Sequence, residues 1–93
     1  MDDVQFDGLL GTCDETAILE FFFLLEGIEY TSETVANDIG ISTAKANKIL
    51  KKFAKYKFLN EKTHNKKITY TLNKDSIIFK NLKQINDFIV KEM

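Results

Sequence analysis

The side chains in this sequence that could do chemistry are mostly lysines, and catalytic or metal-binding groups are few. The 93 residues include 13 Lys and no Arg, one Cys (Cys13) and one His (His64). A metal site needs several nitrogen, sulfur or carboxylate ligands close together, and Cys13 and His64 do not form such a cluster. The sequence has no glycine-rich phosphate loop and no nucleophile motif. We therefore expect a protein that is not an enzyme and that uses neither a metal nor a cofactor.

The lysines are unevenly distributed along the chain. Residues 45–67 carry nine Lys and a single acid, Glu61, whereas residues 1–44 carry ten acidic residues and no Lys. The formal net charge of -1 therefore conceals two segments of opposite sign. Clustered cations attract polyanions such as nucleic acids even when the total charge is close to zero. This asymmetry indicates a local face for a polyanionic partner.

The stretch from Thr31 to Phe53 has the spacing of a helix-turn-helix unit. Counted from Ser32, such a unit needs a small residue at its fifth place and a residue that tolerates positive φ at its ninth. Ala36 and Gly40 stand at these places. The places that must be apolar also agree, and they are Val35, Ile39, Ile41, Ala46 and Ile49. The pattern predicts one helix that starts at Thr31 or Ser32 and ends near Ile39, and a second that runs from Ser42 to about Lys57.

The rest of the chain supplies elements that would position this unit. A length of 93 residues is typical of one domain with one core. Residues 13–26 are apolar on nearly all sides and follow a capping box at Thr12–Glu15, which predicts a central helix. Alternating patterns predict a short strand at 28–30 and a hairpin, and a capped amphipathic helix closes the chain. The expected hairpin arms are 58–62 and 68–72, and the last helix begins at Asn73 or Asp75 and ends near Lys91.

These segments resemble the archaeal and bacterial winged-helix regulators of the MarR/ArsR kind. The matching stretches are TSETVANDIGISTAKANKILKKFAKYKFL and KKITYTLNKDS, followed by the terminal helix. The start, LLGTCDETAILEFFFLLEG, is similar to the first helix of short archaeal members. The resemblance covers most of residues 9–92, and the metal-ligand clusters of ArsR proteins are absent. It implies an α+β, mainly α, winged helix-turn-helix fold with a three-helix core, a hairpin wing and a C-terminal helix. It also implies DNA binding through the third helix and the wing, usually as a homodimer.

The third helix of this unit has two faces when it is drawn at 100° per residue. The apolar face carries Ala46, Ile49, Leu50, Phe53 and Tyr56, and the polar face carries Ala44, Asn47, Lys48, Lys51 and Lys55. A helix with a polar, lysine-bearing face fits the DNA major groove, and its first turn reaches base edges while later lysines neutralise phosphates. The alternative is a lysine face that contacts solvent alone. The residues predicted near base edges are Ser42, Thr43, Ala44, Asn47 and Lys48, and those predicted near phosphates are Lys51, Lys52 and Lys55.

The hairpin tip is predicted to contact the DNA backbone or the minor groove, where cations are favoured. Its residues are His64, Asn65, Lys66 and Lys67, and the alternative is a polar turn without a ligand. The last helix carries apolar residues at a 4-3-4 spacing, which is typical of a packing seam. The seam consists of Ile78, Leu82, Ile85 and Ile89. It favours a homodimer over a helix that packs wholly within its own chain.

Three parts of the chain are expected: an acidic, partly ordered arm at 1–11, a winged helix-turn-helix domain at 12–74, and a C-terminal dimerisation helix at 75–93. The leading hypothesis is a cytoplasmic transcriptional regulator that binds double-stranded DNA in a sequence-specific way as a homodimer. No signal peptide or membrane span is predicted, and no residue points to a small-molecule effector. The alternative is a winged helix that binds another protein in a transcription or replication assembly, with the acidic residues of 1–44 as its docking face. Cys13 is interpreted as an ordinary helix-start residue, with a redox switch as the alternative.

Overall fold

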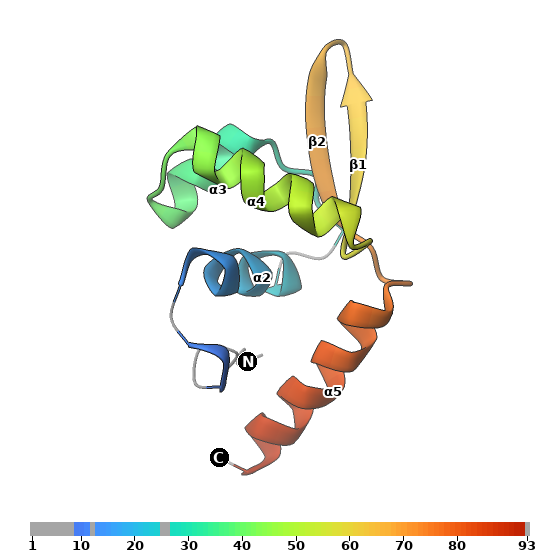
Figure 1. Cartoon of the computed structure of the whole chain (residues 1–93). Helices are drawn as coiled ribbons and strands as arrows, with labels where there is room; N and C mark the ends of the chain where they lie inside the picture. Colours follow the sequence, from blue (N-terminus) through green and yellow to red (C-terminus); the bar gives the residue numbers. More distant parts are fainter. Residues whose placement is uncertain (1–8, 12, 25–26, 93) are drawn as a thin grey trace.

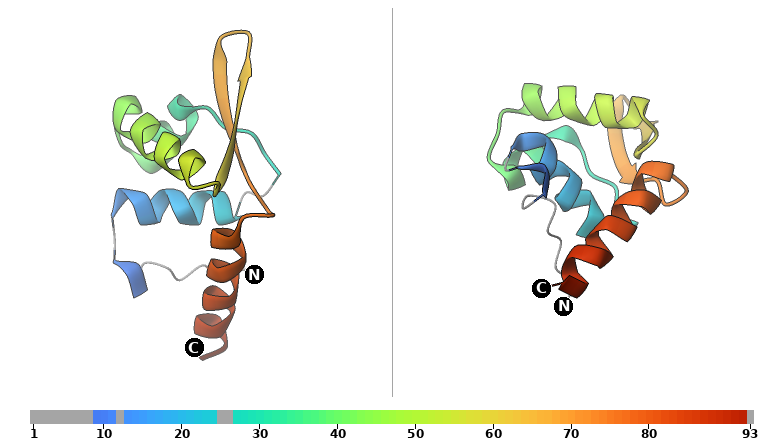
Figure 2. Two further views of the ribbon diagram at one scale, coloured as in Figure 1. Left: turned by 45° about the vertical axis from the view of Figure 1, so that its right-hand side comes forward. Right: turned by 60° about the horizontal axis from the view of Figure 1, so that its bottom comes forward.

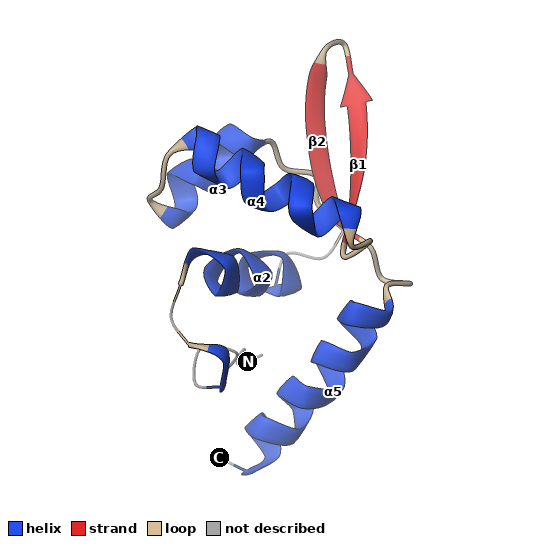
Figure 3. Ribbon diagram, in the orientation of Figure 1, coloured by secondary structure: helices blue, strands red, loops and turns tan. Residues whose placement is uncertain are grey.

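The computed structural model describes residues 9–11, 13–24 and 27–92, which form helices and one β-hairpin (Figures 1 and 3). The elements, named as in Figure 1, are α2 (Asp14–Leu24), α3 (Ser32–Ile39), α4 (Thr43–Lys55), β1 (Leu59–His64), β2 (Lys67–Leu72) and α5 (Ile77–Glu92). Their order is the predicted one, except that the expected strand at 28–30 is a single bridge between Tyr30 and Tyr70. Within the described residues, no helix is both long and apolar enough to cross a membrane.

The helix-turn-helix unit has the caps that the sequence predicts. Thr31 accepts a hydrogen bond from the Thr34 amide at the start of α3, and Ser42 accepts one from the Lys45 amide at the start of α4. Gly40 ends α3 with a φ of 86° in the left-handed region. Such caps pair backbone groups that a helix end leaves free. The turn between α3 and α4 is therefore determined largely by local sequence.

The start of α5 differs from the predicted one, and part of the predicted start of α2 lies outside the described residues. The residue that caps α5 is Ser76, whose hydroxyl accepts from the amides of Ile78 and Phe79, so the predicted cap at Asn73 or Asp75 is wrong. Asn73 instead accepts from the Asp75 amide within the preceding turn, a local bond that asparagine readily forms. Thr12, the first residue of the predicted capping box, lies outside the described residues, as do residues 1–8 of the predicted arm.

The core lies where α2, α3, α4 and the base of the hairpin meet (Figures 1 and 2). Ile18 and Phe22 of α2 are fully buried, and so are Leu50 of α4 and Tyr70 of β2. Each fully buried side chain of this size contributes about 1.5–3 kcal/mol through the apolar area it removes from water. Phe21 and Phe23 of α2 are partly buried against the same core. The ring centroids of Phe23 and of Phe79 in α5 lie 5.0 Å apart. The helix that is apolar on nearly all sides is thus central, as predicted.

The hairpin projects beyond the helices, with its base in the core and its far end exposed (Figure 1). His64 pairs with Lys67, so the connection is the two-residue turn Asn65-Lys66 and not the predicted five-residue tip. Asn65 and Lys66 both have positive φ, 49° and 69°. Two positive φ values match a type I′ turn, which fits the natural twist of paired strands. The longer ladder therefore replaces the loop that the polar sequence predicted.

Helix α5 lies apart from the α3–α4 pair and reaches away from the hairpin (Figures 1 and 2). Its first turns pack on the core through Phe79, Ile78 and Leu82. Four of its large apolar side chains are exposed instead, with exposed fractions of 72% for Ile77, 65% for Phe88, 39% for Ile85 and 37% for Val90. The predicted seam is therefore divided, because Ile78 and Leu82 serve the core of their own chain.

The turn residue Gly40 allows a sharp stability test. A side chain at Gly40 would meet no heavy atom within 4 Å, so its cost is conformational. We expect Gly40→Ala to lower the free energy of unfolding by about 1–2 kcal/mol, the cost of a left-handed non-glycine residue. Gly40→Asn should cost less, because asparagine tolerates this conformation. Urea unfolding followed by circular dichroism measures both, and an equal loss for the two variants would contradict this explanation.

Candidate nucleic-acid interface

Helix α4 presents an exposed strip on the side opposite the core. Ile49, Leu50 and Phe53 are buried, together with Ala46. The exposed strip consists of Ala44, Lys48, Lys51 and Lys55. The two predicted faces of this helix are thus present, except that Tyr56 lies beyond the last turn and is 56% exposed. Thr43 and Ser42 lie at the start of the same strip, and both are exposed.

One edge of the strip is bound to α2 by ion pairs. Lys45 pairs with Asp14, and Lys52 Nζ lies 3.4 Å from Glu15 Oε2. The hydrogen bond and the charge of Asp14 raise the pKa of Lys45. Two acids of the acidic half of the chain therefore engage two lysines of α4. Lys52, which was predicted near phosphates, faces α2 instead of the exposed strip.

The other edge of the strip contacts α3. The amide oxygen of Asn47 accepts a hydrogen bond from the Ser32 hydroxyl at 3.1 Å. Ser32 is 7% exposed and Asn47 is half-buried, so this bond belongs to the packing of α3 on α4. Recognition of adenine by asparagine uses both the amide oxygen and the amide nitrogen. Asn47 would have to release Ser32 before it could make that contact.

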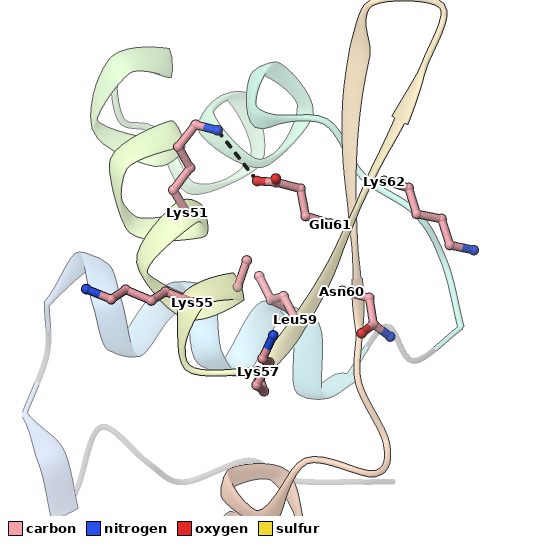
Figure 4. Close-up of a pocket in the computed structure, with 8 residues that line it drawn as sticks. Lys51, Lys55, Lys57, Leu59, Asn60, Glu61 and Lys62 are labelled. Carbon is pink, nitrogen blue, oxygen red and sulfur yellow. Dashed lines mark ion pairs between the residues drawn. The ribbon is translucent and has the colours of Figure 1, made fainter.

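A groove of about 650 Å³ separates the second half of α4 from β1 (Figure 4). Its walls carry Lys51 and Lys55 of α4, Lys57 of the turn and residues 60–62 of β1. Lys51 and Glu61 point toward each other across it, with Lys51 Nζ 3.5 Å from Glu61 Oε2. The same carboxylate oxygen accepts a hydrogen bond from the Tyr70 hydroxyl at 3.0 Å. Burial and the bond to Glu61 both raise the pKa of Tyr70.

The groove adds four polar residues for which the sequence predicted no site role: Lys57, Asn60, Glu61 and Lys62. The unusual position of Glu61 as the single acid within 45–67 was visible in the sequence. Its partner was not, because Lys51 lies on a different element and the separation of ten residues crosses a turn. Strand alternation does place Glu61 on the same side of β1 as buried Leu59, as the register of the hairpin has it.

The tip of the hairpin is exposed at Asn65, Lys66 and Lys67. His64 belongs to the end of β1, where its Nε2 lies 3.4 Å from Glu29 Oε1. The Thr69 hydroxyl donates to the same oxygen at 2.8 Å, and this bond, followed by the charges of His64 and Lys62, lowers the pKa of Glu29. His64 is thus engaged with the loop before α3, while the three following residues face solvent.

The strip and the hairpin together form a basic surface with a fixed charge pattern. Among the residues that the structure describes, six lysines of this region have no ion-pair partner: Lys48, Lys55, Lys57, Lys62, Lys66 and Lys67. They lie on α4, on the turn that follows it and on the hairpin. Unpaired lysines on a convex helix beside a protruding hairpin can contact the phosphates of a polyanion.

Other reactive groups lie outside this surface. Cys13 is exposed at the start of α2, and a hydrogen bond with the Thr16 hydroxyl at 3.3 Å lowers the pKa of its thiol. Across residues 9–11, 13–24 and 27–92, no three His, Cys, Asp or Glu side chains lie close enough to hold a metal ion.

The fold is shared with solved structures of ZitR from Lactococcus lactis. An apo form of a ZitR double mutant superposes with a TM-score of 0.60, at 18% identity over 85% of this chain and 61% of that chain. A ZitR mutant in complex with DNA gives a TM-score of 0.57, at 19% identity over 82% of this chain and 52% of that chain. The chain thus spans between half and two thirds of the ZitR chains. No protein-family model matches the sequence, and no curated protein matches it.

Identity this low shows the fold and no closer relationship. The predicted class, an α+β and mainly α winged-helix topology with three helices, a hairpin and a C-terminal helix, is confirmed. Membership in the MarR/ArsR regulators stays a prediction.

The contact between Glu29 and Thr69 predicts a measurable pH dependence. Because the pKa of Glu29 is lowered in the folded protein, the contact adds stability above the ordinary pKa of glutamate. That stability is lost as the pH falls through the lowered pKa. Thr69→Val removes the hydroxyl, so we expect the NMR titration midpoint of the Glu29 carboxyl to move to higher pH. Thr63→Val, at an exposed position of β1, is the matched control. An equal shift of the Glu29 midpoint in both variants would show that the bond from Thr69 is not the cause.

Proposed function

We propose that this chain is a cytoplasmic transcriptional regulator that binds double-stranded DNA in a sequence-specific way as a homodimer. Helix α4 enters the major groove, and the hairpin lies along the backbone or in the minor groove. The observation that carries the proposal is the exposed strip of α4, with its unpaired Lys48 and Lys55, beside a hairpin that ends in Lys66 and Lys67. The major groove admits one helix, and a hairpin beside it reaches the flanking backbone.

The side chains of the strip divide into two roles by their position on α4. Ser42, Thr43, Ala44 and Lys48 belong to the first half, which meets base edges, and Asn47 joins them if it releases Ser32. Lys55 lies further along and neutralises phosphates, and Lys51 joins it where it releases Glu61. On the hairpin, Asn65, Lys66 and Lys67 contact DNA. His64 supports the position of these three residues through its pairing with Glu29.

The similarity to ZitR supports this assignment at the level of the fold. One of the similar structures is a ZitR mutant in complex with DNA, and it covers 82% of this chain. The chain corresponds to 52% of that protein, so the operator and the partners of that protein are not transferred to this chain. The ion pairs Asp14–Lys45 and Glu15–Lys52 add a physical argument. They partly neutralise two lysines on the side toward α2. The lysines of the central strip face outward.

The homodimer is proposed on the exposed apolar side of α5. Ile77, Ile85 and Phe88 lie on one side of that helix. A hollow on this helix is lined by Ile85, Phe88, Ile89 and Leu9 together with the polar Asn81 and Gln84. Apolar side chains grouped in this way are typical of a protein interface. A twofold pair would place two α4 helices for successive major-groove faces about 34 Å apart. The proposed contact thus keeps Ile85 and Ile89 of the predicted seam and adds Ile77 and Phe88.

The lysine assignment is tested by fluorescence anisotropy on duplex DNA over a range of salt concentrations. Lys48→Ala and Lys55→Ala should each weaken binding, and loss of the phosphate contact of Lys55 should reduce the slope of log K against log salt by about 1. Lys52→Ala should have a smaller effect, because Lys52 faces Glu15. Lys80→Ala, on the exposed surface of α5, removes the same charge away from the interface and should change little.

The same titration separates the two candidate functions. Unchanged affinity and slope in Lys48→Ala and Lys55→Ala would show that the strip is not the DNA-binding face. If the unmutated chain ignores duplex DNA even at low salt, the alternative of a protein-binding winged helix is favoured.

The dimer is tested by light scattering at micromolar concentration. We expect the unmutated chain to be a dimer, and the double variant Ile85→Lys, Phe88→Lys to be a folded monomer, because four buried charges would face each other across the twofold axis. Asp87→Lys, on a different side of α5, should leave the dimer intact, and circular dichroism confirms folding in each case. A monomeric unmutated chain would contradict the proposal.

A further inference from the structure

One carboxylate interrupts the basic surface between α4 and the hairpin. Glu61 is the single acid among residues 45–67, and the fold directs it across the groove toward Lys51 (Figure 4). Its Oε2 lies 3.5 Å from Lys51 Nζ and 3.0 Å from the Tyr70 hydroxyl. A negative charge at this place opposes the attraction of the surrounding lysines for a polyanion. Its presence therefore calls for a physical role.

The orientation of Glu61 is set by a group in the core. Tyr70 is completely buried, so its ring and hydroxyl have a fixed position relative to α2 and α4. Its hydroxyl donates a hydrogen bond to Glu61, and burial together with this bond raises the pKa of Tyr70. Glu61 is thus held in place at one oxygen, unlike an acid on an open strand. Its side chain still has an exposed fraction of 38%, and that of Lys51 is 50%, so a ligand in the groove can reach both.

A phosphate that approaches Lys51 has to compete with this carboxylate. The phosphate and Glu61 carry like charges, and both would lie within a few ångströms of Lys51. Salt screens such an encounter weakly, since the Debye length is about 8 Å at physiological ionic strength. A base edge meets a different situation, because its exocyclic amino group can donate a hydrogen bond to a carboxylate.

We propose that Glu61 is a specificity-determining residue, which repels phosphates from the groove and accepts a hydrogen bond from the amino group of a base at the cognate site. Non-specific binding consists almost entirely of lysine–phosphate contacts, so Glu61 weakens it in most registers along the DNA. At the cognate site, the contacts of α4 hold one register in which a base edge faces Glu61. The inference rests on the proposed DNA-binding function and assigns to this residue the discrimination between sites.

The test compares Glu61→Gln with the unmutated chain on random duplex DNA and on a duplex enriched from random sequences by binding to the unmutated chain. Glutamine keeps the size of the side chain and can still accept from Tyr70. We expect affinity for random duplex to rise about two- to fivefold, the range of an exposed ion pair, and the salt slope to steepen. Affinity for the enriched duplex should stay equal or fall, so that the ratio of the two affinities decreases.

Two further variants separate position from total charge. Asp87→Asn changes the net charge by the same amount on α5 and should leave both affinities unchanged. Tyr70→Phe keeps the charge of Glu61 but removes the group that orients it, and it should also decrease the affinity ratio. Circular dichroism shows whether Tyr70→Phe is folded, and the result of Glu61→Gln stands without it.

The outcomes distinguish this inference from the proposal beneath it. If the unmutated chain binds duplex DNA and Glu61→Gln leaves the affinity ratio unchanged, the role of Glu61 is wrong and DNA binding stands. An equal gain in Asp87→Asn would also overturn it, because the effect would then follow total charge. If the unmutated chain binds no duplex at low salt, the proposed function fails and this inference fails with it.

Discussion

The burial of Tyr70 at the base of the hairpin is the constraint on which the arrangement of the basic surface depends. Its ring lies in the core with Phe22 and Leu50, and its backbone bonds to that of Tyr30 in both directions, at 2.9 and 2.8 Å. Its hydroxyl reaches Glu61 in the groove. One residue therefore joins the core, the loop before α3 and the hairpin. Because the strand cannot shift without exposing this ring, the hairpin keeps its angle to α4.

Electrostatics then divides the lysines of α4 by their neighbours. Asp14 and Glu15 engage the lysines on the α2 side, and Glu61 engages Lys51 on the hairpin side. Exposed pairs of this kind contribute little stability. Their larger effect is on direction, since they determine which cations remain available to a ligand. The net charge of -1 is thus compatible with a basic face, because Asp14 and Glu15 lie at one edge of it and Glu61 lies at one point within it.

Much of the fold could be predicted from the sequence, but less of the site. The α3–α4 turn follows from local chemistry, because Gly40 and the Ser42 cap act on their immediate neighbours. The roles expected for Lys52 and His64 were less secure, because the acids that engage them, Glu15 and Glu29, are more than thirty residues away in the chain. Lys52 was predicted near phosphates from its position along the helix, and that position contains no information on what packs beside it.

By itself, the sequence determined the order of the elements, the turn at Gly40 and the two faces of α4, since spacing and capping act over a few residues. Tertiary structure decided the rest. It divided the seam of α5 by using Ile78 and Leu82 in the core, engaged Asn47 with Ser32, and brought Lys51, Glu61 and Tyr70 together at one point of the groove. These contacts depend on how α4 and the hairpin pack around a shared core, and a local sequence pattern contains no information on that packing.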